Sequence, residues 1–173
     1  MISRPFSEVS AGERFGDRLT MSSWHVATAA AMYYDPGPNH VNLEHSETNR
    51  FGRPIAPGFL TTGLMMGVVG RYFGWSIEAF LEAHTRFLSP VYVDDTIEVL
   101  WVVQDTEKKA SLGGGILGMH GWCWARPDRL AVELKIKLAV NESKPPPLRD
   151  PPNGTSPASR RQTTGAEQPV IEK

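Results

Sequence analysis

The sequence predicts an α+β fold in which a long antiparallel sheet wraps around one central buried helix. A nearly uncharged, glycine-containing segment lies between Arg53 and Arg71, and several strand-like stretches follow one another closely after Trp75. Short connections between consecutive strands favour antiparallel pairing, because a parallel crossover needs a dozen or more residues. An apolar helix packed against a sheet that buries one face forms the two layers of an α+β domain.

The N-terminal part of the chain predicts a helix followed by a stiff loop. Ser22 or Ser23 is a suitable N-cap for a helix that runs through Tyr34. The sequence Asp35-Pro36-Gly37-Pro38 must end this helix, since proline removes backbone donors and restricts the residue before it. We expect a short helical turn over residues 43–48.

The central helix is predicted to begin near Pro57, because proline suits the first turn of a helix. Gly63, Gly67 and Gly70 are spaced four and three residues apart, so they share one face of this helix. Each glycine costs a helix roughly 1 kcal/mol relative to alanine. Three of them on one face therefore indicate very close packing, and we expect the curved sheet to be the neighbour.

Four strands are predicted to follow the central helix, over residues 83–93, 96–103, 115–125 and 132–140. Pro90 implies a bulge or an edge position in the first of them. The last strand alternates cleanly between apolar and charged residues, as expected for a strand with one buried face. Because the connections are short, we expect the four strands to form an antiparallel meander.

Composition and charge exclude several classes of function. The 18 Lys and Arg residues against 19 Asp and Glu give a formal net charge of -1, which disfavours general nucleic-acid binding. The N-terminus lacks an apolar signal-peptide core, and the uncharged segment is shorter than the roughly 20 residues of a membrane-spanning helix. Cys123 is the single cysteine, and no histidine pair has metal-ligand spacing supported by carboxylates. We therefore predict a cytoplasmic protein without a membrane span or a metal site.

The composition changes abruptly near Asn141. Residues 141–173 hold half of the prolines in the chain and almost no large apolar side chains. Such a segment cannot bury enough surface to offset the entropy lost on ordering. We predict a folded domain over residues 1–140 and a proline-rich disordered tail over residues 141–173.

The candidate catalytic residues are Asp35 and His40, which lie five residues apart on the proline-stiffened loop. Such a loop can hold two side chains toward one point. If both contact one water, one group accepts a proton while the other donates one, which is general acid–base catalysis. The alternative is structural, with Asp35 capping the loop and His40 hydrogen-bonded to the backbone.

Gly58, at the start of the central helix, is a candidate oxyanion donor. The N–H groups at a helix N-terminus are unpaired and carry a partial positive charge. Because glycine has no side chain, a ligand carbonyl oxygen can approach the N–H of Gly58 closely, and this N–H can stabilise developing negative charge. The alternative is a glycine kept for packing alone.

These residues resemble the signature of the MaoC-like dehydratases, the (R)-specific enoyl-CoA hydratase family. Asp35, Pro38 and His40 are similar to the family motif D-x-N-P-x-H. Residues 51–58, FGRPIAPG, are similar to F-G-x-x-I-A-H-G, and residues 86–95 are similar to a later R-F-x-x-P-V-x-x-G-D segment. The resemblance covers about residues 5–140 and leaves the tail outside.

The resemblance has two departures, at Gly37 and Pro57. The family has Asn where Gly37 stands, and here Asn39 lies just before His40. The family has His where Pro57 stands, although the glycine that follows is kept. The departures put substrate preference in doubt more than the fold.

The resemblance implies a hotdog fold, usually found as a dimer or as paired hotdog domains. It implies an enzyme of fatty acid metabolism that adds water to an enoyl-CoA or removes it from a 3-hydroxyacyl-CoA. In this role Asp35 and His40 would activate water, and the N–H of Gly58 would bind the thioester oxygen. The substrate is a thioester of coenzyme A or of acyl-carrier protein, and no cofactor is expected.

Two other functions stay open. The first is a hotdog acyl-CoA thioesterase, which hydrolyses the thioester with an acidic residue beside the helix start. The second is a non-catalytic subunit that binds acyl-CoA or assembles with a catalytic partner, and the loss of the family Asn at Gly37 favours it.

Overall fold

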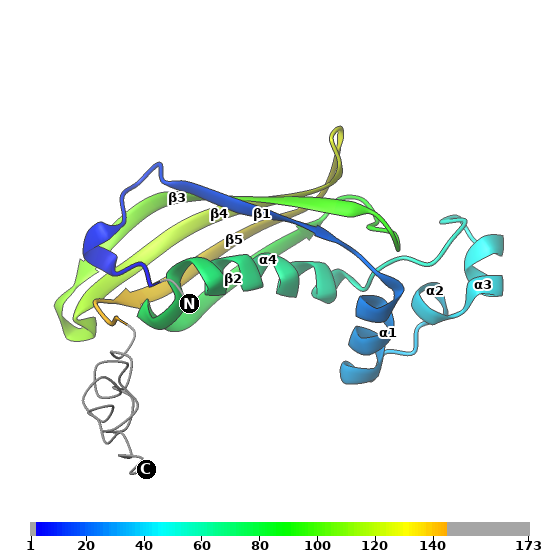
Figure 1. Cartoon of the computed structure of the whole chain (residues 1–173), viewed down its shortest axis with the longest axis horizontal. Coiled ribbons are helices and arrows are strands. Elements are labelled where there is room, and N and C mark those ends of the chain that lie inside the picture. The colour runs from blue at the N-terminus through cyan, green and yellow to red at the C-terminus, as the bar shows by residue number, and fades with distance from the viewer. Residues whose placement is uncertain (1–2, 145–173) are drawn as a thin grey trace, which may run out of the picture.

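The computed structural model describes residues 3–144, in which one antiparallel sheet curves around a central helix (Figure 1). The predicted α+β architecture is confirmed. The strand order is β1-β3-β4-β5-β2. The strands are β1 (Arg14–Thr20), β2 (Ile77–Phe87), β3 (Thr96–Lys109), β4 (Gly114–Arg126) and β5 (Arg129–Asn141).

Three short helices, which hold part of the site, precede the central helix: α1 (Ser23–Met32), α2 (Pro38–Val41) and α3 (Leu43–Thr48). The predicted turn over residues 43–48 is confirmed as α3. Ser22 is the N-cap of α1, since its hydroxyl accepts the N–H of His25 while His25 Nδ1 accepts the N–H of Ser22. Before β1, the chain forms a short 3-10 helix, η1 (Phe6–Glu8).

The central helix, α4 (Gly58–Phe73), lies in the hollow of the sheet (Figure 1). Met65, Val69 and Phe73 are spaced four residues apart and are fully buried, so they form the face that packs on the sheet. Trp101 of β3 is also fully buried, and its indole N–H donates to the Met65 carbonyl oxygen at 3.0 Å. This hydrogen bond satisfies the one polar group that the tryptophan brings into the core.

The glycine face of α4 does not pack against the sheet, so that expectation is wrong. Gly63 is exposed, and a methyl group added there would meet only the hydroxyl oxygen of Tyr33, at 3.9 Å. A methyl group added at Gly70 would meet no atom within 4 Å. The large side chains of Met65 and Val69 fill the space between helix and sheet, which turns the glycines to the opposite side.

The four predicted strands do not form a simple meander. Only β3, β4 and β5 pair in chain order, whereas β2 pairs with β5 at one edge of the sheet and β1 pairs with β3 at the other. The predicted first strand, residues 83–93, is displaced, because β2 ends at Phe87. Residues 88–95 instead connect β2 to β3 across the end of the sheet.

The connection between β2 and β3 pairs with the segment that leads into α4. Ile55 and Tyr92 form an isolated antiparallel bridge, and the N–H of Ala56 donates to the carbonyl oxygen of Val91 at 2.7 Å. Pro90 has no N–H for a sheet ladder, which is consistent with its place in this connection. This pairing brings the connection to the N-terminus of α4, where the site lies.

Strand β3 is longer than predicted. It continues to Lys109 and includes residues expected to form a connection. A register shift between Val103 and Asp105 lets the strand pair with β4 along its polar end as well. The reversal of the chain comes after Lys109, in a single turn of 3-10 helix, η3 (Ala110–Leu112).

No helix within residues 3–144 is both long enough and apolar enough to cross a membrane. Strand β5 ends at Asn141, close to the predicted end of the folded domain. Residues 145–173 of the predicted tail lie outside the described residues, so the domain boundary stays a prediction.

Cys123 of β4 is fully buried, and this burial raises the pKa of its thiol to about 12. Because the thiolate is the reactive form, we expect no reaction of the native protein with a disulfide reagent such as Ellman's reagent at mildly alkaline pH. The same measurement in guanidinium should show one reactive thiol per chain. Rapid labelling of the native protein would contradict the burial of Cys123.

Candidate active site

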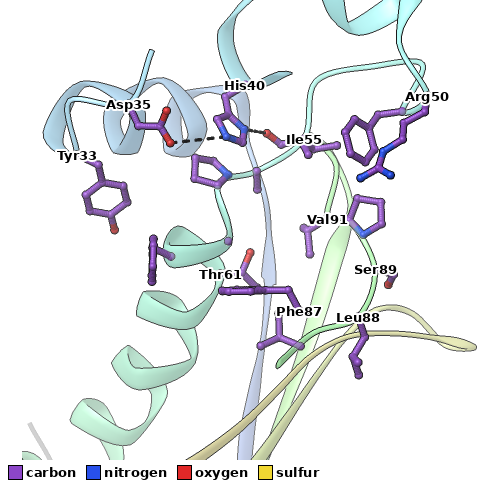
Figure 2. Close-up of a pocket in the computed structure, with 17 residues that line it drawn as sticks. Tyr33, Asp35, His40, Arg50, Ile55, Thr61, Phe87, Leu88, Ser89 and Val91 are labelled. Atoms are coloured by element: carbon purple, nitrogen blue, oxygen red, sulfur yellow. Dashed lines mark hydrogen bonds and ion pairs between the residues drawn. The ribbon is translucent and has the colours of Figure 1, made fainter. Parts of the chain in front are cut away.

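The three residues singled out from the sequence, Asp35, His40 and Gly58, line one cavity of about 620 Å³ (Figure 2). Asp35 follows α1, His40 lies on α2, and Gly58 is the first residue of α4. Figure 2 shows the side chains of Asp35 and His40 pointing toward each other at one side of the cavity. The expectation that these residues share a cavity therefore agrees with the structure.

The end of α1 determines where Asp35 lies. Tyr34 adopts a left-handed φ of 52°, and the N–H of Asp35 donates to the carbonyl oxygen of Ala30 at 3.0 Å, as in a Schellman motif. The helix therefore ends before Tyr34 rather than running through it. One carboxylate oxygen of Asp35, Oδ1, accepts the N–H of Gly37 at 3.1 Å, so Oδ2 remains available toward His40.

Gly37 occupies tight space between the two candidate catalytic side chains. A methyl group added to Gly37 would lie 3.0 Å from Asp35 Oδ1 and 3.2 Å from His40 Cδ2. The N–H of His40 in turn donates to the carbonyl oxygen of Gly37 at 2.9 Å. The loop is thus held by backbone hydrogen bonds at the position where the family motif has Asn.

The hydrogen bond of His40 to the backbone defines its tautomer. Nδ1 lies 2.8 Å from the carbonyl oxygen of Ile55, and a carbonyl can only accept, so Nδ1 carries the hydrogen. In the neutral ring Nε2 then has a free lone pair. Nε2 lies 3.9 Å from Asp35 Oδ2, which is too long for a direct hydrogen bond.

Sequence reasoning missed the polar residues that hold α2 and α3 in place. Asn39 Oδ1 accepts from Asn49 Nδ2 at 2.8 Å, and the carbonyl oxygen of Asn39 accepts the N–H of Ile55 at 3.0 Å. Ser46 is fully buried, and its hydroxyl donates to the carbonyl oxygen of Asn42 at 2.7 Å. The loop is therefore positioned by these hydrogen bonds as well as by its prolines, and the Asn and Ser residues after His40 were the available signal.

Gly58 follows the N-cap Pro57, so its N–H is one of the donors without an acceptor inside the helix. A methyl group added to Gly58 would lie 2.7 Å from Cε1 of Phe87, the last residue of β2. Close packing against Phe87 and a role for the backbone N–H can therefore both explain why position 58 is a glycine. The ring of Phe87 excludes a side chain at a position whose N–H has no acceptor among residues 3–144.

Most of the remaining wall of the cavity is apolar, and includes Phe59, Phe87, Leu88, Val91 and Val132. The rings of Phe59 and Phe87 meet edge to face, with centroids 6.2 Å apart. A cavity of this kind, with a few polar groups on an apolar wall, is typical of a small-molecule site.

The sequence profile of the MaoC like domain matches residues 12–116. The chain belongs to the MaoC-like domain family. The (R)-specific enoyl-CoA hydratase of Rhodospirillum rubrum is 26% identical to this MaoC-like chain over 97 residues, which are 56% of this chain and 67% of that protein. The (R)-specific enoyl-CoA hydratase of Aeromonas caviae is 32% identical over 72 residues, which are 42% of this chain and 54% of that protein.

The structure of the R-hydratase PhaJ1 from Pseudomonas aeruginosa in the unliganded form superposes with a TM-score of 0.72. The superposition covers 86% of this MaoC-like chain and 97% of that chain, at 20% sequence identity. At this identity the likeness shows the fold, and it confirms the hotdog fold that the family resemblance implied.

No group of three or more His, Cys, Asp or Glu side chains within residues 3–144 is arranged to hold a metal ion. That no cofactor takes part stays a prediction. The polar groups that line this MaoC-like cavity include the carboxylate of Asp35, the imidazole of His40 and the guanidinium of Arg50, and Gly58 lines it as well.

Proposed function

We propose that this MaoC-like protein is a hydro-lyase that adds water to an enoyl-CoA thioester or removes water from a 3-hydroxyacyl-CoA. The observation that carries the proposal is the position of Asp35 Oδ2 and His40 Nε2, 3.9 Å apart in the cavity that also contains Gly58. Family membership and the names of the two hydratase relatives support the same class of reaction.

The distance between Asp35 Oδ2 and His40 Nε2 allows one water molecule to bridge the two side chains. A water makes hydrogen bonds of about 2.8 Å, and the separation of the two side-chain atoms is less than twice that length, so one water can contact both. As the water oxygen bonds to C3 of the enoyl group, one of the two side chains accepts the released proton. The pair then delivers this proton to C2, which breaks the bond between the side chain and the proton and restores the starting protonation of both groups.

Gly58 is proposed to stabilise the negative charge that develops during water addition. Conjugation with the thioester makes C3 electrophilic, and bonding of water at C3 moves electron density to the thioester oxygen. The N–H of Gly58 and the N-terminal end of α4 present partial positive charge to this oxygen. The glycine is thus assigned the role of oxyanion donor, and the Asp35–His40 pair that of proton transfer.

We propose that the protein works as a dimer or pairs with another hotdog domain through the outer edge of β2. Phe80 and Leu81 of β2 are 40% and 48% exposed, and no other strand within residues 3–144 pairs with the outer edge of β2. Phe87 and Leu88 at the end of this strand are exposed as well, and they line the cavity, so a partner there would extend its wall. We expect light scattering after gel filtration to give twice the monomer mass, and a monomeric, fully active protein would contradict the pairing.

A single assay separates the proposed hydro-lyase from the two alternatives. Hydration of crotonyl-CoA removes the enoyl absorbance without releasing thiol, whereas a thioesterase releases free CoA that a thiol reagent detects. We expect loss of the enoyl absorbance with no thiol release, and the reverse reaction with 3-hydroxybutyryl-CoA. Thiol release would support the thioesterase, and binding of acyl-CoA without turnover over a range of chain lengths would support a non-catalytic subunit.

A further inference from the structure

Arg50 lies in the cavity wall and forms no ion pair with another residue of the described range 3–144. It follows α3 and lines the same cavity as Asp35 and His40. Within residues 3–144, every arginine except Arg14 and Arg50 has a carboxylate oxygen within 4.0 Å. Arg14 lies on the edge strand β1 and does not line this cavity. Arg50 therefore carries a charge that no neighbouring acid in the described part of the chain neutralises.

The guanidinium of Arg50 is placed to receive an anion. Its central carbon lies 4.7 Å from the centre of the Phe51 ring, a cation–π contact that restrains the side chain. The N–H groups of a guanidinium point outward in its plane, so a cation–π contact at the central carbon leaves them able to donate. A planar fork of N–H groups matches two oxygens of a phosphate or a carboxylate.

The charges around the cavity make Arg50 the group that selects an anion. Figure 2 shows Arg50 on the side of the cavity away from Asp35. Among the described residues that line the cavity, Arg50 is the one with a permanent positive charge, and Asp35 is an acid that would repel an anion. An anionic group of a ligand would therefore bind on the Arg50 side of the cavity, and the reacting atoms would lie near Asp35 and His40.

Building on the proposed function, we propose that Arg50 binds an anionic oxygen group of the thioester substrate. Two parts of a substrate carry this chemistry: a phosphate of the carrier arm and a carboxylate on the acyl group. Arg50 is exposed, so it stands at the mouth of the cavity rather than at its floor. The carrier arm leaves through the mouth, which favours the phosphate as the group that Arg50 binds.

The test uses saturated thioesters, which bind without being hydrated, in isothermal titration calorimetry. Butyryl-CoA, butyryl-phosphopantetheine and butyryl-pantetheine differ in their phosphates, and succinyl-pantetheine carries an acyl carboxylate without any phosphate. We expect Arg50→Gln to weaken butyryl-CoA binding about 10- to 100-fold, the range for a charge-assisted hydrogen bond. Butyryl-pantetheine should bind equally to the wild type and the variant. The affinity of Arg50→Lys for butyryl-CoA should lie between those of the wild type and Arg50→Gln, since lysine keeps the positive charge but lacks the planar fork of N–H groups.

The ligand series also identifies the source of the anion. If Arg50→Gln loses equal affinity for butyryl-CoA and butyryl-phosphopantetheine, Arg50 binds the phosphate next to pantetheine, which coenzyme A and acyl-carrier protein share. If the variant loses affinity for butyryl-CoA alone, Arg50 binds one of the remaining phosphates of coenzyme A. If it loses affinity for succinyl-pantetheine alone, Arg50 binds an acyl carboxylate.

Arg14→Gln is the matched control, because Arg14 also lacks an acid partner among the described residues but lies outside the cavity. We expect this variant to bind every ligand as the wild type does. Unchanged binding of all four ligands by Arg50→Gln would overturn the proposal, and so would an equal loss for butyryl-pantetheine, which has no anionic group. Binding that depends on Arg50 without hydration of any enoyl-CoA would instead overturn the proposed function and leave this inference standing.

Discussion

Replacing Asp35 by Asn or His40 by Gln should lower kcat for crotonyl-CoA hydration by about 10²- to 10⁴-fold, the usual contribution of a general acid or base. Asp35→Asn keeps an oxygen for the N–H of Gly37 but removes the carboxylate charge that the proton transfer requires. His40→Gln removes the ring nitrogen that faces Asp35. The measurement is the initial rate of loss of the enoyl absorbance at saturating substrate.

The double variant and a control histidine test whether Asp35 and His40 act as one unit. Groups that act together show non-additive losses, so the double variant should be little slower than the slower single variant. His45→Gln is the matched control, since His45 is exposed and its backbone N–H, rather than its ring, makes the hydrogen bond to Asn42. Wild-type kcat in either single variant, with circular dichroism unchanged, would remove that residue from the chemistry.

Helix ends and strands could be predicted from the sequence where the local residue types determine the backbone conformation. Ser22 caps α1 as its type and position indicated, and the alternating pattern of the last strand corresponds to β5. The order of the strands was not predictable in the same way. Strand β2 pairs with β5, and the connection after β2 pairs with the segment before α4; such long-range pairings leave no local periodicity in the sequence.

The glycines of α4 show a limit of reasoning from spacing alone. Spacing correctly places Gly63, Gly67 and Gly70 on one face, but it does not say which face meets the sheet. The fully buried Met65 and Val69 decide that question, because large apolar side chains gain far more from burial than glycine does. A helix that is apolar almost all round gives a weak sequence signal for its orientation.

The sequence was enough to name the candidate site residues, but it did not reveal the contacts that hold them in place. Asp35, His40 and Gly58 follow from the loop, the helix start and the family resemblance. The acceptor that sets the tautomer of His40 is the backbone carbonyl of Ile55, and a backbone group has no residue type for a motif to detect. Phe87 lies in a segment similar to the family motif, yet its contact with Gly58 depends on where β2 ends.

Replacing Gly58 by Ala should lower kcat/KM for crotonyl-CoA hydration by about 10²-fold, which is the lower end of the loss for a missing oxyanion donor. The added methyl group would lie 2.7 Å from Cε1 and 2.9 Å from Cζ of Phe87, so the ring must move. The methyl group also stands beside the N–H that the thioester oxygen is proposed to approach. Steady-state kinetics and the free energy of unfolding in urea, measured on the same variant, report the two effects separately.

The variant Phe87→Ala separates the two reasons for a glycine at position 58. Removing the ring takes away the steric conflict, so Gly58→Ala should cost less stability in the Phe87→Ala background than in the wild type. If the methyl group blocks the approach of the thioester oxygen, Gly58→Ala should still lower kcat/KM by a similar factor in that background. Recovery of kcat/KM in the double variant to the value of Phe87→Ala alone would instead show that the glycine serves packing against Phe87. Because alanine keeps the backbone N–H, that result would assign the glycine to packing against Phe87 and would leave the N–H at the start of α4 in place as the donor to the thioester oxygen.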